Sequence, residues 1–72
     1  MTTTEIAAIR QLATTLCRQN TTWRAGQCWF NALNTLHPEI ANQVRGGDLD
    51  PYYDNRRIIV FLDFLEHYEP TN

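Results

Sequence analysis

The sequence predicts an all-α fold: a compact domain of three to four helices whose second helix is central and largely buried. Apolar residues recur at the spacing of an α-helix along most of the chain. Helix start and stop signals, among them a capping box, a proline and a pair of glycines, divide the chain into segments. With 72 residues, of which 43% are hydrophobic, the chain suits a single domain, residues 1–72, around one small core.

The first helix is expected from about residue 3 to residue 18. Thr2 and Glu5 have the spacing of a capping box at a helix N-terminus. Asn20 suits the end of this helix. The apolar residues that follow form one stripe at helical spacing, namely Ile6, Ile9, Leu12, Ala13, Leu16 and Cys17.

The second helix is expected over residues 21–37, with Thr21 or Thr22 as its N-cap. Apolar side chains cover most of its circumference, which is typical of a helix with neighbours on several sides. Gly26 costs about 1 kcal/mol of helix propensity relative to alanine. We therefore expect another helix or an aromatic ring to approach the chain closely at Gly26.

A narrow polar strip remains on this second helix, and it includes Arg24, Gln27 and Asn31. One interpretation is structural: the strip faces solvent or bonds to the connector at residues 48–54. The other is functional: amides and an arginine next to Trp23 form a surface for a partner. The sequence leaves both interpretations open.

A short third helix is expected to begin at Pro38 and to end at Gly46 and Gly47, where glycine supplies a left-handed cap. The fourth helix is expected from about residue 55 to residue 68, with Asp54 as its N-cap and Pro70 after its end. The apolar run at residues 58–62 would also suit a strand, but the chain offers no second strand to pair with it.

Ile59 of the fourth helix falls among polar positions, away from the main apolar stripe. Since Val60 and Phe64 flank it, Ile59 can centre a contact patch with a second copy or another protein. A homodimer through this helix is therefore one of the options that the sequence leaves open.

The segment RGGDLDPYYDNRR, residues 45–57, is best explained as a connector between helices. As a calcium loop it would carry Tyr53 where glycine is required and Ile59 where glutamate is required. As a phosphate loop it fails because its glycines close a helix instead of opening one. The structural account expects a single turn at residues 51–53 and both tyrosine rings on the core. It also expects ion pairs that join Arg45, Arg56 and Arg57 to Asp48, Asp50 and Asp54.

Metal, cofactor and catalytic sites are not expected. The residues of ligand type, Cys17, Cys28, His37 and His67, lack the spacing of a zinc site. We expect both cysteines to be reduced and packed as small apolar residues, because no secretion signal or membrane span is evident and a cytoplasmic location follows. A net charge of −2 argues against binding nucleic acid through bulk electrostatics, although all the cations are arginines.

The stretch from Trp23 to Leu65 contains Arg-x-Gly-Gln, Asn-x-Leu, Pro, Arg-Gly, Asp-Pro-Tyr-Tyr-Asp and a closing Arg. This pattern resembles short proteins of unknown function that bacteriophages and prophages carry, with Gly47 in place of an expected threonine. The matching residues are Arg24, Gly26, Gln27, Asn31, Leu33, Pro38, Arg45, Gly46, Asp50, Pro51, Tyr52, Tyr53, Asp54 and Arg57. The resemblance implies a phage or mobile-element origin.

We therefore expect a non-enzymatic protein-binding module that acts in the host cell on a host or phage complex, such as an inhibitor of host defence in the manner of anti-CRISPR proteins. The alternatives are an accessory protein that binds nucleic acid through its arginines, and a structural or assembly component. The candidate partner-binding residues are Arg24, Gln27, Asn31, Arg45, Asp50, Tyr52, Asp54, Arg56 and Ile59.

Overall fold

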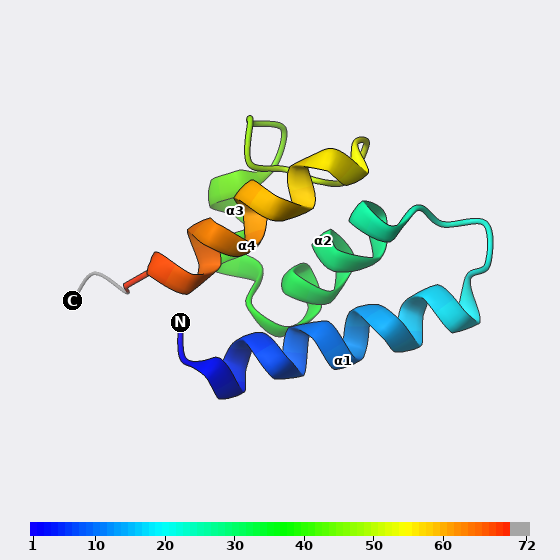
Figure 1. Ribbon diagram of the computed structural model, residues 1–72, viewed down its shortest axis with the longest axis horizontal. Coiled ribbons are helices and arrows are strands. Elements are labelled where there is room, and N and C mark those ends of the chain that lie inside the picture. The colour runs from blue at the N-terminus through cyan, green and yellow to red at the C-terminus, as the bar shows by residue number, and fades with distance from the viewer. Residues whose placement is uncertain (70–72) are drawn as a thin grey trace.

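The computed structural model describes residues 1–69, and in this part of the chain the fold is all-α, as expected (Figure 1). The elements are α1 (Thr3–Gln19), α2 (Ala25–Leu36), α3 (Pro38–Val44), the 3-10 turn η1 (Asn55–Arg57) and α4 (Ile58–His67). Residues 58–62 are therefore helical. None of the described helices is long and apolar enough to cross a membrane. Pro70, which was expected to follow the last helix, lies outside the described residues.

The helix ends that depend on neighbouring residues are confirmed. Thr2 and Glu5 form the capping box, in which each side chain accepts a hydrogen bond from the other residue's backbone N–H. Pro38 is the first residue of α3, and Gly46 beyond its end has a φ of 75°, in the left-handed region. The expected start of the fourth helix is only partly right: the side chain of Asp54 accepts a hydrogen bond from the backbone N–H of Arg56 and caps the 3-10 turn η1, whereas α4 begins at Ile58 with Arg57 as its N-cap.

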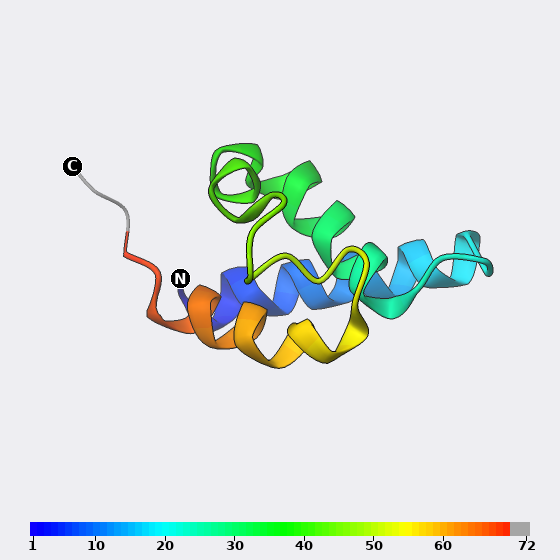
Figure 2. The same ribbon diagram turned by 90° about the horizontal axis from the view of Figure 1, so that it is seen from above.

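Helix α2 is the centre of the molecule, as its apolar circumference predicts. It packs against α1, α3 and η1, and α4 lies alongside α1 (Figures 1 and 2). The rings of Trp29 on α2 and Phe61 on α4 meet edge to face, with their centroids 6.3 Å apart. The core comprises Ile9, Ala13, Cys28, Phe30, Ala32, Leu33, Ile40, Ala41, Val44, Phe61 and Leu65.

The N-terminus lies beside the C-terminal end of α4 (Figures 1 and 2). The ammonium group of Met1 donates hydrogen bonds to the carbonyl oxygens of Leu65, at 2.9 Å, and Tyr68, at 2.6 Å. Carbonyls at a helix C-terminus have no partner within the helix and carry partial negative charge. The positive charge of Met1 therefore satisfies these groups and joins α1 to α4.

The expected start of the second helix is wrong. Helix α2 begins at Ala25, with Arg24 in the N-cap position and no side-chain capping bond, so Thr21 and Thr22 lie in the preceding loop. The backbone N–H of Gly26 needs an acceptor there, because the first amides of a helix have no intrahelical partner. That acceptor is the side-chain oxygen Oδ1 of Asn55, at 2.8 Å. A residue distant in sequence therefore takes the place of a local cap.

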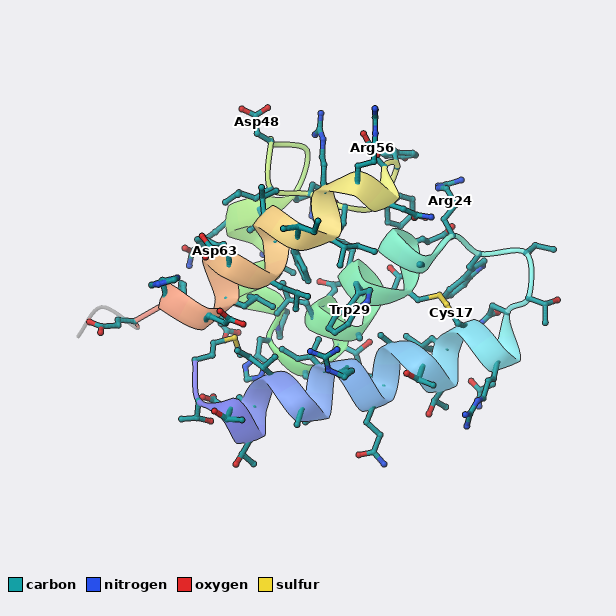
Figure 3. The ribbon with its side chains drawn as sticks, viewed as in Figure 1. Cys17, Arg24, Trp29, Asp48, Arg56 and Asp63 are labelled. Atoms are coloured by element: carbon teal, nitrogen blue, oxygen red, sulfur yellow. A yellow bond between two sulfur atoms is a disulfide. The ribbon has the colours of Figure 1, made fainter. Side chains whose placement is uncertain are left out.

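The expectation of two reduced cysteines is also wrong. Cys17 on α1 and Cys28 on α2 form a disulfide, visible as the yellow bond beside Cys17 in Figure 3. The Cα atoms of the two residues are 5.8 Å apart, a separation that suits a disulfide. The two cysteines come together because both lie on the faces with which α1 and α2 pack against each other.

Candidate functional site

The connector at residues 45–57 folds back onto the first turn of α2, and Gly26 makes this contact. A Cβ atom at Gly26 would lie only 2.0 Å from the carbonyl oxygen of Pro51. The expected close approach at Gly26 is therefore present. However, the approaching group is a backbone carbonyl of the connector, where a helix or a ring was expected. Any side chain at this position would displace the connector.

Asp50 holds the connector in its folded shape. Its side chain is almost fully buried, with 9% exposed. One carboxylate oxygen accepts a hydrogen bond from the backbone N–H of Gly46 at 2.8 Å, and the other accepts one from Tyr52 at 2.9 Å. The turn that follows is closed by the N–H of Asp54, which donates to the carbonyl of Pro51. The expected turn after Asp50 is confirmed.

The expected ion pairs within the connector are largely absent. In residues 1–69, Asp54 pairs with Arg56, whereas Asp48 and Asp50 pair with no arginine. The hydrogen bonds from the Arg56 side chain and backbone hold the pKa of Asp54 below its ordinary value, and the same pair raises the pKa of Arg56. Arg57 instead donates to the carbonyl of Gly47. Asp50 needs no cation, because backbone N–H groups already satisfy both of its oxygens.

Arg24 and the two tyrosines form an exposed cluster beside this turn. The Arg24 side chain donates through Nε and Nη2 to the carbonyl of Tyr52, at 3.2 and 3.1 Å. Its guanidinium carbon lies 5.6 Å from the centre of the Tyr53 ring and 6.0 Å from that of Tyr52, which is cation–π geometry. The Tyr52 ring packs edge to face on Phe30 of the core, and its hydroxyl accepts from Gln27. The expectation that the Tyr53 ring packs on the core is wrong, because 81% of this residue is exposed.

A groove of about 450 Å³ lies between α2 and the connector. Arg45 covers part of it, with its guanidinium carbon 5.0 Å from the centre of the Phe30 ring. Nη2 of Arg45 donates to the side-chain oxygens of Asn34 and Asn42. The lining residues are Phe30, Asn31, Asn34, Arg45, Gly46, Asp50, Tyr52 and Tyr53, and we call this surface the arginine–aromatic groove.

Both arginines of this region are fixed in place without a carboxylate. Within residues 1–69, neither Arg24 nor Arg45 has a carboxylate oxygen within 4.0 Å. A backbone carbonyl and an aromatic face hold Arg24, and two amide oxygens and an aromatic face hold Arg45. The positive charges are therefore oriented, and neither forms an ion pair with an acid of the described chain.

Two observations concern metal ligands and reactive thiols in the described residues. Residues 1–69 contain no cluster of histidine, cysteine and acidic side chains that could hold a metal ion. Cys17 and Cys28 are bonded to each other, so neither has a thiol to offer as a nucleophile or a metal ligand. The groove is lined by aromatic faces, amides, the guanidinium group of Arg45 and the hydrogen-bonded carboxylate of Asp50.

The structure divides the candidate residues into three groups. Arg24, Gln27, Asn31, Arg45, Asp50 and Tyr52 lie in or beside the arginine–aromatic groove, Asp54 and Arg56 pair at η1, and Ile59 stands exposed on α4. Sequence reasoning did not single out Phe30 and Tyr53 as partner-binding residues, or Asn55 as the partner of Gly26. The adjacent aromatics of Tyr52 and Tyr53 were the one available signal. Comparisons with protein-family models, with curated proteins and with solved structures find no match.

Proposed function

We propose that this chain is a non-catalytic protein-binding module that uses the arginine–aromatic groove to hold an acidic segment of a partner protein. The observation that carries this proposal is the fixed orientation of Arg24 and Arg45, two exposed cations that have no carboxylate oxygen within 4.0 Å in the described chain. Tyrosine and arginine are the residues that most often dominate the energy of protein interfaces.

The fixed conformation of the groove residues favours binding in two ways. First, the connector is fixed by the carboxylate of Asp50 and by the bond from Gly26 to Asn55, so little conformational entropy remains to be lost on binding. Second, a planar guanidinium that already rests on a ring can form a bidentate pair with a carboxylate. The exposed ring of Tyr53 supplies apolar area next to this charge.

The partner and its compartment belong to the same proposal. The resemblance to phage and prophage proteins supports a host complex as the target, and inhibition of host defence is a role that fits a small module without catalytic groups. Cellular reductants keep cytoplasmic thiols reduced, so the disulfide between Cys17 and Cys28 argues for an oxidising compartment over the host cytoplasm.

The test is a pull-down from bacterial cells with the wild-type chain and matched charge variants, read by mass spectrometry. Arg45→Glu should abolish capture of the partner, and Tyr53→Ala should reduce it, while the thermal midpoint of each variant stays within a few degrees of the wild type. Arg18→Glu, which makes the same charge change on α1 outside the groove, should capture the partner normally. Equal capture by Arg45→Glu and the wild type would refute the proposal.

A salt series separates this proposal from the nucleic-acid alternative. Binding to DNA or RNA through Arg10, Arg18, Arg24 and Arg45 would weaken steeply with salt and would be lost after nuclease treatment. A captured protein that persists after nuclease treatment supports the groove proposal. Capture that disappears with the nucleic acid would favour the alternative. A virion or assembly component would instead be captured only in cells that produce phage particles.

A further inference from the structure

Helix α4 and the η1 turn before it expose a stripe of side chains that faces away from the core. Ile59 is 77% exposed and Val60 is 45% exposed, whereas Phe61 and Leu65 on the opposite face are buried. The side chains of Arg56 and Asp63 are 91% and 73% exposed. Residues three or four positions apart lie on the same face of a helix, so Ile59, Val60 and Asp63 share one face of α4. Arg56 lies in the η1 turn directly before them, and the four exposed residues form one surface. We call it the α4 stripe.

The charges of the α4 stripe are arranged symmetrically about its apolar centre. Arg56 precedes Ile59 by three residues, and Asp63 follows Val60 by three residues. If two α4 helices pair antiparallel about a two-fold axis between Ile59 and Val60, Arg56 of each copy lies opposite Asp63 of the other. Two ion pairs then flank an apolar contact. Parallel pairing would place like charges opposite each other and is disfavoured.

We propose that the α4 stripe is an antiparallel dimer interface with a second copy of this chain. Asp54 orients Arg56 for this contact, because its carboxylate accepts hydrogen bonds from Nε and Nη2 of Arg56, both at 3.0 Å. Nη1 of Arg56 then remains available to donate to the second copy. A shallow apolar depression lies beside Val60 and adds Leu49, Phe64 and Tyr68 to the contact. Figure 3 shows Asp63 on α4 and Arg56 in the η1 turn before it, both away from the disulfide.

The size of the interface sets the expected strength. One pair of short helices buries less than the roughly 1,200 Å² of a stable protein–protein interface. The dimer should therefore be weak and concentration-dependent, with a Kd on the order of 100 µM. The α4 stripe is separate from the arginine–aromatic groove, so either proposal can fail while the other stands.

Sedimentation equilibrium of the purified chain between about 10 µM and about 1 mM tests this inference. The mean mass of the wild type should rise toward that of a dimer over this range. Ile59→Asp should stay monomeric at the highest concentration with an unchanged thermal midpoint. Ala8→Asp, which adds the same charge to an exposed position of α1, should dimerise like the wild type.

A charge swap tests the register of the pairing. Arg56→Glu alone and Asp63→Arg alone should each be monomeric, because each places like charges across the axis. An equimolar mixture of these two variants should form a heterodimer, and a chain with both substitutions should recover self-association. A wild type that is monomeric at about 1 mM, or a dimer that survives every one of these substitutions, would overturn the inference.

Discussion

Replacing Gly26 with alanine tests how the connector is held against α2. The added Cβ would lie 2.0 Å from the carbonyl oxygen of Pro51, whereas ordinary contact begins at 3.4 Å, so the two groups must separate by about 1.4 Å. This oxygen belongs to backbone that accepts a hydrogen bond from Asp54, so it cannot rotate away as a flexible side chain would. The same displacement pulls Asn55 from the N–H of Gly26.

The expected cost follows from three opposing effects. Overpacking costs about 1–3 kcal/mol, and an unsatisfied buried N–H costs about 1–3 kcal/mol. The better helix propensity of alanine returns about 1 kcal/mol. Gly26→Ala should therefore lower the free energy of unfolding by about 3 kcal/mol, the centre of a range of about 1–5 kcal/mol, which corresponds to about 12–24 °C in Tm for a domain of this size.

Thermal and urea unfolding followed by circular dichroism measure this loss, and Gly47→Ala is the matched control. A Cβ at Gly47 meets the carbonyl of Val44 at an ordinary 3.5 Å, so this variant should change stability by less than about 0.5 kcal/mol. An unobstructed glycine in a helix would tolerate alanine without loss of stability. If Gly26→Ala is as stable as the wild type, the connector does not contact α2 at Gly26 as described.

Two further predictions concern the disulfide and the end of α4. The disulfide closes a separation of 11 residues, so reduction, or the double variant Cys17→Ser with Cys28→Ser, should lower stability by about 3 kcal/mol, and the variant's melting curve should not respond to reductant. A wild-type Tm that reductant leaves unchanged would contradict the disulfide. The backbone carbonyl of Asp63, 2.9 Å from Nδ1, and then the Asp63 carboxylate raise the pKa of His67 above its ordinary 6.5. The stabilisation from this contact is therefore present below pH 6.5 and is lost as the pH rises through the folded-state pKa, and an NMR titration should place the midpoint above 6.5. Asp63→Asn should lower that midpoint, and a wild-type midpoint at or below 6.5 would refute the contact.

The parts of the fold that depend on local chemistry were predictable from the sequence. The capping box of Thr2 and Glu5, Pro38 at the start of α3, the left-handed Gly46 and the Asp54 cap are each determined by residues a few positions apart. The central position of α2 was predictable as well, because only a helix with neighbours on several sides can bury so wide an apolar surface.

The errors arose where a distant residue replaced a local one. Thr21 and Thr22 are good N-cap residues, but the acceptor that α2 uses is the side chain of Asn55, 29 residues beyond Gly26. The pairing of Cys17 with Cys28 likewise depends on how two helices pack, which the spacing of the cysteines does not reveal. The same limit applies to the groove: Phe30, Arg45 and Tyr53 come from three parts of the chain, and the position of the connector brings them to one region.

Hydrogen exchange at the Gly26 amide tests the central claim most directly, namely that the connector is fixed to α2 and thereby forms the arginine–aromatic groove. In the first turn of a helix this N–H would exchange rapidly without an acceptor from elsewhere in the chain. The bond to Asn55 predicts that Gly26 is strongly protected, that Ala25 beside it exchanges quickly, and that Asn55→Ala removes the protection of Gly26. Exchange of Gly26 as rapid as that of Ala25 in the wild-type protein would contradict the account.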